Sequence, residues 1–142
     1  MTNFFKKSDL SRNDAEKIVS DTLNKCDDGE LYLEDSKYET IILDDNKIKD
    51  SSYSSDLGFG FRAISDDIVA YSHSNEISKN SLKQSSESLK STLKTARGNY
   101  NHSIPKSNKK YYENINPIEQ KSLNEKIEIL NKVNNYLRSK DS

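Results

Sequence analysis

Two histidines occur in the chain, and neither is spaced for metal binding. His73 follows an apolar run in Tyr71-Ser72-His73-Ser74-Asn75, and His102 lies in a polar stretch. No second histidine stands at helical spacing from His73 to complete a ligand set. A Gly-x-Ser-x-Gly elbow, a phosphate-binding glycine loop and a paired-cysteine motif are also absent. We therefore assign no catalytic, cofactor-binding or metal-ligating residue and expect both histidines at the surface.

Carboxylates are plentiful, and most of them are expected in turns, where Asp bonds to its own backbone. A pair in a turn is a poor acid–base dyad because water keeps both groups ionised. The residues concerned are Asp27, Asp28, Glu30, Glu34, Asp35, Asp44, Asp45, Asp66 and Asp67.

Arg62 interrupts an apolar run at the same strand parity as Gly58 and Gly60. We favour a structural ion pair or a solvent-facing side chain for Arg62, and the alternative is a contact with a partner chain or a peptide carboxylate. Gly58-Phe59-Gly60 resembles half of a dinucleotide fingerprint, but no third glycine and no helix follow. Glycine weakens a strand interior, so the pair predicts close packing in a central antiparallel strand.

Composition bounds the remaining possibilities. The 142 residues suit one modest core, with 32% hydrophobic residues and a formal net charge of −1. The single Cys26 excludes an internal disulfide and falls on an apolar helical stripe, which predicts a buried thiol in a reducing compartment. The N-terminus is not a signal peptide, and no segment approaches the ~18 apolar residues of a membrane span. We expect a cytoplasmic protein with no membrane partner.

The one basic cluster, from Lys106 to Tyr112, lies in a polar linker. Its lysines and tyrosines could contact phosphates and bases, but a net charge near zero provides no electrostatic case for nucleic acid. We expect a solvated loop and no nucleic-acid partner.

Three helices are predicted from apolar residues at helical spacing. The first spans Ser11 to Lys25, with a capping box of Asn13 and Glu16 and a stop before Gly29. The second begins after Ser78 and ends at Gly98, with its stripe on Leu82, Leu89, Leu93 and Ala96. The third begins at the capping box Ser122-Leu123-Asn124-Glu125, with its stripe on Leu123, Ile127, Leu130, Val133 and Leu137.

Between the first two helices the apolar period changes to two, which predicts about five short strands. Their connections are too short for parallel crossovers, so the sheet should be an antiparallel meander. The expected strands begin at Glu30, Tyr38, Lys47, Gly58 and Ile68, with turns at 44–47 and 66–67.

The predicted fold is therefore α+β: this meander flanked by an N-terminal helix and two C-terminal helices. Residues 1–10 form a tail, 11–98 the helix–sheet–helix core, 99–116 a polar linker and 117–142 the last helix.

The order of these elements resembles the N-terminal domain of the TldD/PmbA family, in particular its TldD branch. The resemblance runs from about residue 8 to the end and is most specific in its middle. It is carried by Asp28-Gly29-Glu30-Leu31-Tyr32-Leu33, Leu43-Asp44-Asp45-Asn46-Lys47-Ile48-Lys49, Asp56-Leu57-Gly58-Phe59-Gly60-Phe61-Arg62-Ala63-Ile64-Ser65, Ala70-Tyr71-Ser72, Ile77-Ser78, Asn116-Pro117 and Ser122-Leu123-Asn124-Glu125-Lys126-Ile127-Glu128-Ile129-Leu130.

The resemblance implies a cytoplasmic, zinc-dependent metallopeptidase, also known as a modulator of DNA gyrase. It implies a heterodimer with a TldE (PmbA) subunit that encloses the active site and admits unfolded peptides. The family's zinc ligands and catalytic glutamate belong to a His-Glu-x-x-x-His motif plus a distal cysteine in a C-terminal domain. None of these positions occurs here, so we expect an N-terminal fragment that is inactive alone and binds no zinc.

Two other functions remain open. The chain could be a stand-alone protein-interaction module, and a natural stop codon after Ser142 would favour that reading over a continuing frame with the zinc motif. Nucleic-acid binding through Lys106, Lys109 and Lys110 predicts salt-sensitive retention on DNA or RNA.

Overall fold

A computed structural model describes residues 4–6, 8–94, 111, 113 and 115–140. The elements are, in order, η1 (Phe4–Lys6), α1 (Arg12–Leu23), β1 (Asp28–Asp44), β2 (Lys47–Ser65), β3 (Ile68–Ser74), α2 (Lys79–Thr92), η2 (Pro117–Gln120) and α3 (Leu123–Arg138). The described residues form an antiparallel sheet in the order β1-β2-β3, together with three α-helices. The α+β class is confirmed.

The expected number of five strands is wrong, because two pairs of predicted strands are each continuous. β1 runs through Asp35-Ser36-Lys37 and β2 runs through Ser54-Ser55-Asp56 without a break. These stretches contain no glycine or proline, and they have paired neighbours for their backbone groups. The side chains at 54–56 are exposed and those at 35–37 are half-buried, so their polar groups keep contact with solvent along the extended backbone.

Both turns lie where they are expected. Asp45 and Asn46 have φ of 44° and 61°, the two positive angles that a type I′ hairpin turn needs. Asp66 has a φ of 51° at the β2–β3 turn, and its backbone N–H donates to Asp27 Oδ2 at 2.7 Å. Short Asp and Asn side chains tolerate this left-handed backbone better than other residues.

The contacts divide the chain into two compact units. Unit 1 comprises Met1–Ser36 and Asp56–Tyr111, and unit 2 comprises Lys37–Ser55 and Tyr112–Ser142. β1 and β2 each run through both units.

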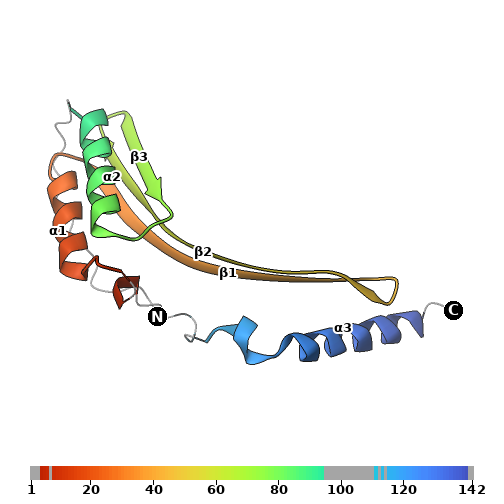
Figure 1. Cartoon of the computed structure of the whole chain (residues 1–142). Helices are drawn as coiled ribbons and strands as arrows, with labels where there is room; N and C mark the ends of the chain where they lie inside the picture. Colours follow the sequence, from red (N-terminus) through yellow and green to blue (C-terminus); the bar gives the residue numbers. More distant parts are fainter. Residues whose placement is uncertain (1–3, 7, 95–110, 112, 114, 141–142) are drawn as a thin grey trace. The chain divides into compact units, whose positions relative to one another are not determined.

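In unit 1, α1 and α2 pack side by side, and α2 also packs on β3 (Figure 1). The apolar core between these elements comprises Leu10, Ala15, Leu23, Cys26, Phe59, Phe61, Ala63, Ala70, Ile77, Leu82, Leu89 and Leu93. Burial of each large side chain in such a core contributes about 1.5–3 kcal/mol. Cys26 is buried and unbridged, as expected.

Hydroxyl groups join the layers of unit 1. The hydroxyls of Thr22 and Ser86 lie 2.7 Å apart between the two helices, and Ser72 donates to Ser85 at 3.0 Å between β3 and α2. Because these polar groups are satisfied by one another, they fix the positions of the elements without an unpaired burial cost.

The predicted caps are correct for two helices and wrong for the first. Ser78 caps α2, and Ser122 with Glu125 forms the expected capping box of α3. α1 instead begins after Ser11, whose hydroxyl accepts from the N–H of Asp14 at 3.0 Å. The hydroxyl of Ser11 in turn donates a hydrogen bond to the carboxylate of Asp14. The expected ends of α1 and α2 are also revised, since they finish at Leu23 and Thr92, and Gly98 lies outside the described residues.

Gly29 does not end α1, as the sequence suggests, but lies inside β1. Its φ is not positive, so it is not a left-handed helix cap. A Cβ on Gly29 would lie 2.8 Å from the carbonyl oxygen of Arg62 and would collide with the side chain of Leu23. The glycine therefore allows the close approach of β1 to the helix and to β2.

In unit 2, polar contacts connect α3 and η2 with the neighbouring parts of β1 and its turn. Lys126 forms an ion pair with Glu39 and also donates to the carbonyl of Ile118. Lys37 pairs with Glu119 at 2.9 Å. Three of the five residues of the apolar stripe of α3 stay exposed: Leu123, Val133 and Leu137, at 43%, 51% and 60%.

Candidate functional site

The sheet of unit 1 has one covered face and one open face. Phe59, Phe61 and Ala63 of β2 point toward the helices and are buried. The alternate positions, Gly58, Gly60 and Arg62, lie on the open face, as their shared parity predicts. Across the β2–β3 ladder, His73 is opposite Gly60 and Tyr71 is opposite Arg62. Tyr71 and His73 therefore also lie on the open face.

The two glycines leave room for neighbouring atoms. A Cβ on Gly58 would lie 2.7 Å from the carbonyl oxygen of Ser74, and a Cβ on Gly60 would lie 2.7 Å from the hydroxyl of Tyr71. β2 is the central strand, as expected. The prediction of close packing at both glycines is confirmed.

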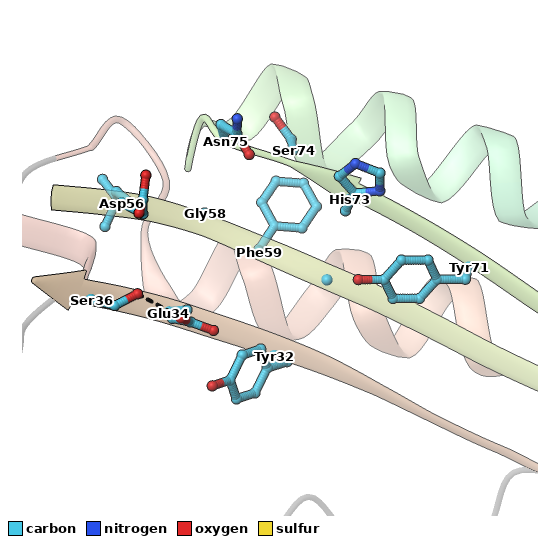
Figure 2. Close-up of a pocket in the computed structure, with 12 residues that line it drawn as sticks. Tyr32, Glu34, Ser36, Asp56, Gly58, Phe59, Tyr71, His73, Ser74 and Asn75 are labelled. Carbon is cyan, nitrogen blue, oxygen red and sulfur yellow. Dashed lines mark hydrogen bonds between the residues drawn. The ribbon is translucent and has the colours of Figure 1, made fainter. Parts of the chain in front are cut away.

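A shallow hollow of about 280 Å³ lies over Gly58 and Gly60 (Figure 2). In the figure the ring of Tyr71 extends from β3 toward β2, and Tyr32 projects from β1. The hollow is lined by Tyr32, Glu34, Ser36, Asp56, Leu57, Gly58, Phe59, Gly60, Tyr71, His73, Ser74 and Asn75. All of these residues belong to unit 1.

Two aromatic side chains on this face stack on one another, and the tyrosines of the face remain accessible. The rings of Tyr71 and His73 stack with their centroids 5.9 Å apart and their planes 26° apart. Tyr71 is nevertheless 63% exposed and Tyr32 59%. His73 lies within β3, not after it, and is a surface residue, as expected.

The charged groups of this face separate into two sets. Arg62 Nη2 lies 3.0 Å from Glu30 Oε1 and 3.9 Å from Asp28 Oδ2, which is the structural ion pair that we favoured. Glu34 instead accepts a hydrogen bond from the hydroxyl of Ser36 and, with Asp56, borders the hollow. Asp28, Glu30, Glu34 and Asp35 lie in β1 and not in turns, so the expectation for them is wrong.

The remaining sequence candidates lie elsewhere. His102 and most of the basic cluster from Lys106 to Tyr112 lie outside the described residues, in which only Tyr111 of the cluster is included. Cys26 lies in the core of unit 1, where burial, and secondarily the charge of Asp27, raises the pKa of its thiol. A buried thiol with a raised pKa is a poor nucleophile.

Comparison with known proteins identifies the family. Residues 29–99 match the family model described as PmbA/TldA metallopeptidase domain 1. This segment contains nearly all of β1 and the whole of β2, β3 and α2. The chain belongs to the TldD/PmbA family.

Individual members of the TldD/PmbA family resemble the chain over most of its length. It is 34% identical over 118 residues to the metalloprotease TldD homolog of Buchnera aphidicola subsp. Acyrthosiphon pisum, which covers 82% of this chain and 24% of that protein. It is 31% identical over 121 residues to the metalloprotease TldD homolog of Haemophilus influenzae, with 81% and 24% covered. The chain thus spans about a quarter of the length of these curated relatives.

The metalloprotease names of these relatives imply a metal site, which needs at least three ligand side chains brought together. Across residues 4–6, 8–94, 111, 113 and 115–140, no three His, Cys, Asp or Glu side chains come together as ligands. His73 stacks on Tyr71, and Cys26 is in the core with its Sγ 3.7 Å from the carbonyl of Thr22. The described residues therefore do not fit a metal centre. In the same part of the chain, no helix is both long and apolar enough to cross a bilayer.

The residues that shape the open face of this TldD/PmbA domain were only partly predictable. The glycine pair is detectable from its parity. The sequence pattern assigns no role to Tyr32, Tyr71 and Asp56, and it places Glu34 among the carboxylates expected in turns. The sequence signal that could have found the two tyrosines is their alternation with apolar residues, Tyr32 on the first predicted strand and Tyr71 on the last. Its meaning depends on the β2–β3 register, which the sequence does not specify.

Proposed function

We propose that this chain is the non-catalytic first domain of a TldD-like, zinc-dependent metallopeptidase that hydrolyses unfolded peptides in the cytoplasm. The match of residues 29–99 to the first domain of the family is the observation that supports this assignment most strongly. In this proposal, peptide hydrolysis by metal-activated water takes place on residues outside the chain.

The work of the domain itself is to pack against the catalytic domain and a TldE/PmbA-like subunit. Two features support a binding role. The open sheet face carries exposed Tyr32 and Tyr71 beside a hollow, and three of the five residues of the apolar stripe of α3 are exposed. Each of these two patches, taken by itself, gathers exposed apolar side chains, which is typical of interaction sites.

A peptidase assay with the purified 142-residue chain tests the non-catalytic role. The chain is incubated with zinc and an unfolded peptide library, and cleavage is followed by mass spectrometry, with a full-length TldD homolog as the positive control. We expect no cleavage above the no-protein control. Zinc-dependent cleavage that survives repurification and is abolished by a chelator would contradict the proposal.

The second candidate is a stand-alone interaction module, which the same open face favours. The two candidates differ in the reading frame downstream of Ser142. A continuing frame that encodes a His-Glu-x-x-x-His motif supports the peptidase domain, and a stop codon supports the module.

A further inference from the structure

The hollow on the open face is sized for one side chain. Its volume of about 280 Å³ lies at the lower limit of small-molecule pockets, which span roughly 300–1,000 Å³. Its floor is backbone at Gly58 and Gly60, and aromatic side chains of β1 and β3 stand beside it (Figure 2). Such a site favours a flat, narrow group over a bulky ligand.

Tyr71 provides a preformed aromatic surface. Its hydroxyl occupies the space that a side chain at residue 60 would fill, and Gly60 itself is buried. Stacking on His73 further limits the ring, while 63% of the residue stays accessible. A ring held in this way can stack with a cation at little conformational cost.

The charge at the hollow is negative. Among the described residues that line it, Glu34 and Asp56 are carboxylates and there is no Lys or Arg. Arg62 lies on the same face but is paired with Glu30 and does not line the hollow. An uncompensated acidic site beside aromatic rings is complementary to a cation.

We propose that this hollow binds an arginine side chain of an extended peptide segment. A guanidinium is planar, stacks on tyrosine and can form two parallel hydrogen bonds with a carboxylate, whereas a lysine ammonium is a strongly hydrated point charge. The site is shallow and surface-exposed, so one arginine carried by a peptide suits it better than an enclosed small ligand. The inference does not depend on the peptidase assignment, because a stand-alone module could use the same site.

The test is an NMR titration of the ¹⁵N-labelled chain with capped Gly/Ser peptides. They carry one central arginine, lysine or citrulline, the last being a neutral isostere of arginine. The chain has four glycines, so the amide signals of Gly58 and Gly60 are readily followed. We expect the arginine peptide to shift both signals with a Kd of roughly 1 mM, and the citrulline and lysine peptides to bind at least about fivefold more weakly. Gly29, which faces Leu23, should not move.

Matched variants locate the binding to the hollow. Glu34→Gln and Asp56→Asn should each weaken arginine-peptide binding about two- to fivefold, and Tyr71→Leu by a similar factor. Glu87→Gln is the control, since Glu87 is an exposed acid of α2 that does not line the hollow. Equal binding of the arginine and citrulline peptides, equal binding of arginine and lysine, or equal effects of Glu34→Gln and Glu87→Gln would each overturn the proposal. Backbone spectra of every variant verify the fold.

Discussion

The hydroxyl of Tyr71 lies 2.7 Å from the point that a Cβ on Gly60 would occupy, so the tyrosine fills the space left by the absent side chain. The two residues are diagonal neighbours across the β2–β3 ladder, since Tyr71 is opposite Arg62 and Gly60 is opposite His73. The glycine thereby permits an aromatic ring to lie on a central strand. This relationship shapes the open face of the domain.

The two glycines should respond differently to alanine. At Gly60 the obstructing atom is the end of an exposed tyrosine that can move away, so Gly60→Ala should change the free energy of unfolding by no more than about 1 kcal/mol. At Gly58 the obstructing atom is the backbone oxygen of Ser74, so Gly58→Ala should destabilise by about 2 kcal/mol or more. Urea unfolding measures both. Equal losses would show that the ring of Tyr71 is as immovable as the backbone.

Glu125 should make the start of α3 sensitive to acid. Hydrogen bonds from the backbone N–H of Ser122, and then from its hydroxyl, lower the pKa of Glu125 below its ordinary value near 4.5. A lowered pKa contributes stability above the unfolded-state value, and that stability is lost as the pH falls through the folded-state pKa. The protection of the amides in the first turn of α3, which is the exchange rate divided into the intrinsic chemical rate at the same pH, should therefore fall in acid.

Glu125→Gln is the control for this effect, because its amide oxygen can still accept from Ser122 but does not titrate. Ser122→Ala should remove the cap at a cost of about 1 kcal/mol of helix stability. An unchanged acid response in Glu125→Gln would assign the effect to another group.

The Asp14–Lys79 ion pair should control the titration of Asp14. Lys79 Nζ lies 2.8 Å from Asp14 Oδ1, and this hydrogen bond, followed by the one from Ser11, lowers the pKa of Asp14. Lys79→Met should raise that pKa toward its ordinary value, and Ser11→Ala should raise it less. Carboxyl ¹³C NMR titration measures the change. Lys83→Met is the matched control, since Lys83 acts only as a distant charge, and an equal effect of both lysines would exclude the direct bond as the cause.

Cys26 should be unreactive in the folded chain. Its side chain is buried, and burial raises the pKa of the thiol, so a thiol reagent at pH 8 should label the native chain about a hundredfold or more slowly than the chain in urea. Colorimetric labelling with a disulfide reagent measures both rates. Rapid native labelling would place Cys26 at the surface.

Patterns within a few residues predicted the local structure well. The helix caps and the turns depend on residue types that stand next to one another in the sequence. The cases are Ser78, Ser122 and the turns at 45–46 and 66–67. The cap at Ser11 is not visible in the sequence as a capping box, because the residue three positions later is Asp14 and the motif has Glu or Gln there. The strands were divided too finely because polar residues at 35–37 and 54–56 resemble turns unless their pairing is known.

The hollow could not be predicted because it depends on contacts between strands. Alternation places Tyr32, Gly60 and Tyr71 on a face, but only the register brings Tyr71 over Gly60. The role of Arg62 also depends on the pairing of strands, because the structural ion pair forms only if β1 brings Glu30 next to Arg62.

Zinc binding by the purified chain is the measurement that decides whether this first domain is non-catalytic. The chain competes with a chromogenic zinc chelator at pH 7, and a full-length TldD homolog serves as the positive control. We predict that the chelator retains the zinc, because the described residues bring no three ligands together. If the chain instead withdraws one zinc ion from the chelator and cleaves peptides only when that zinc is bound, then the domain is catalytic.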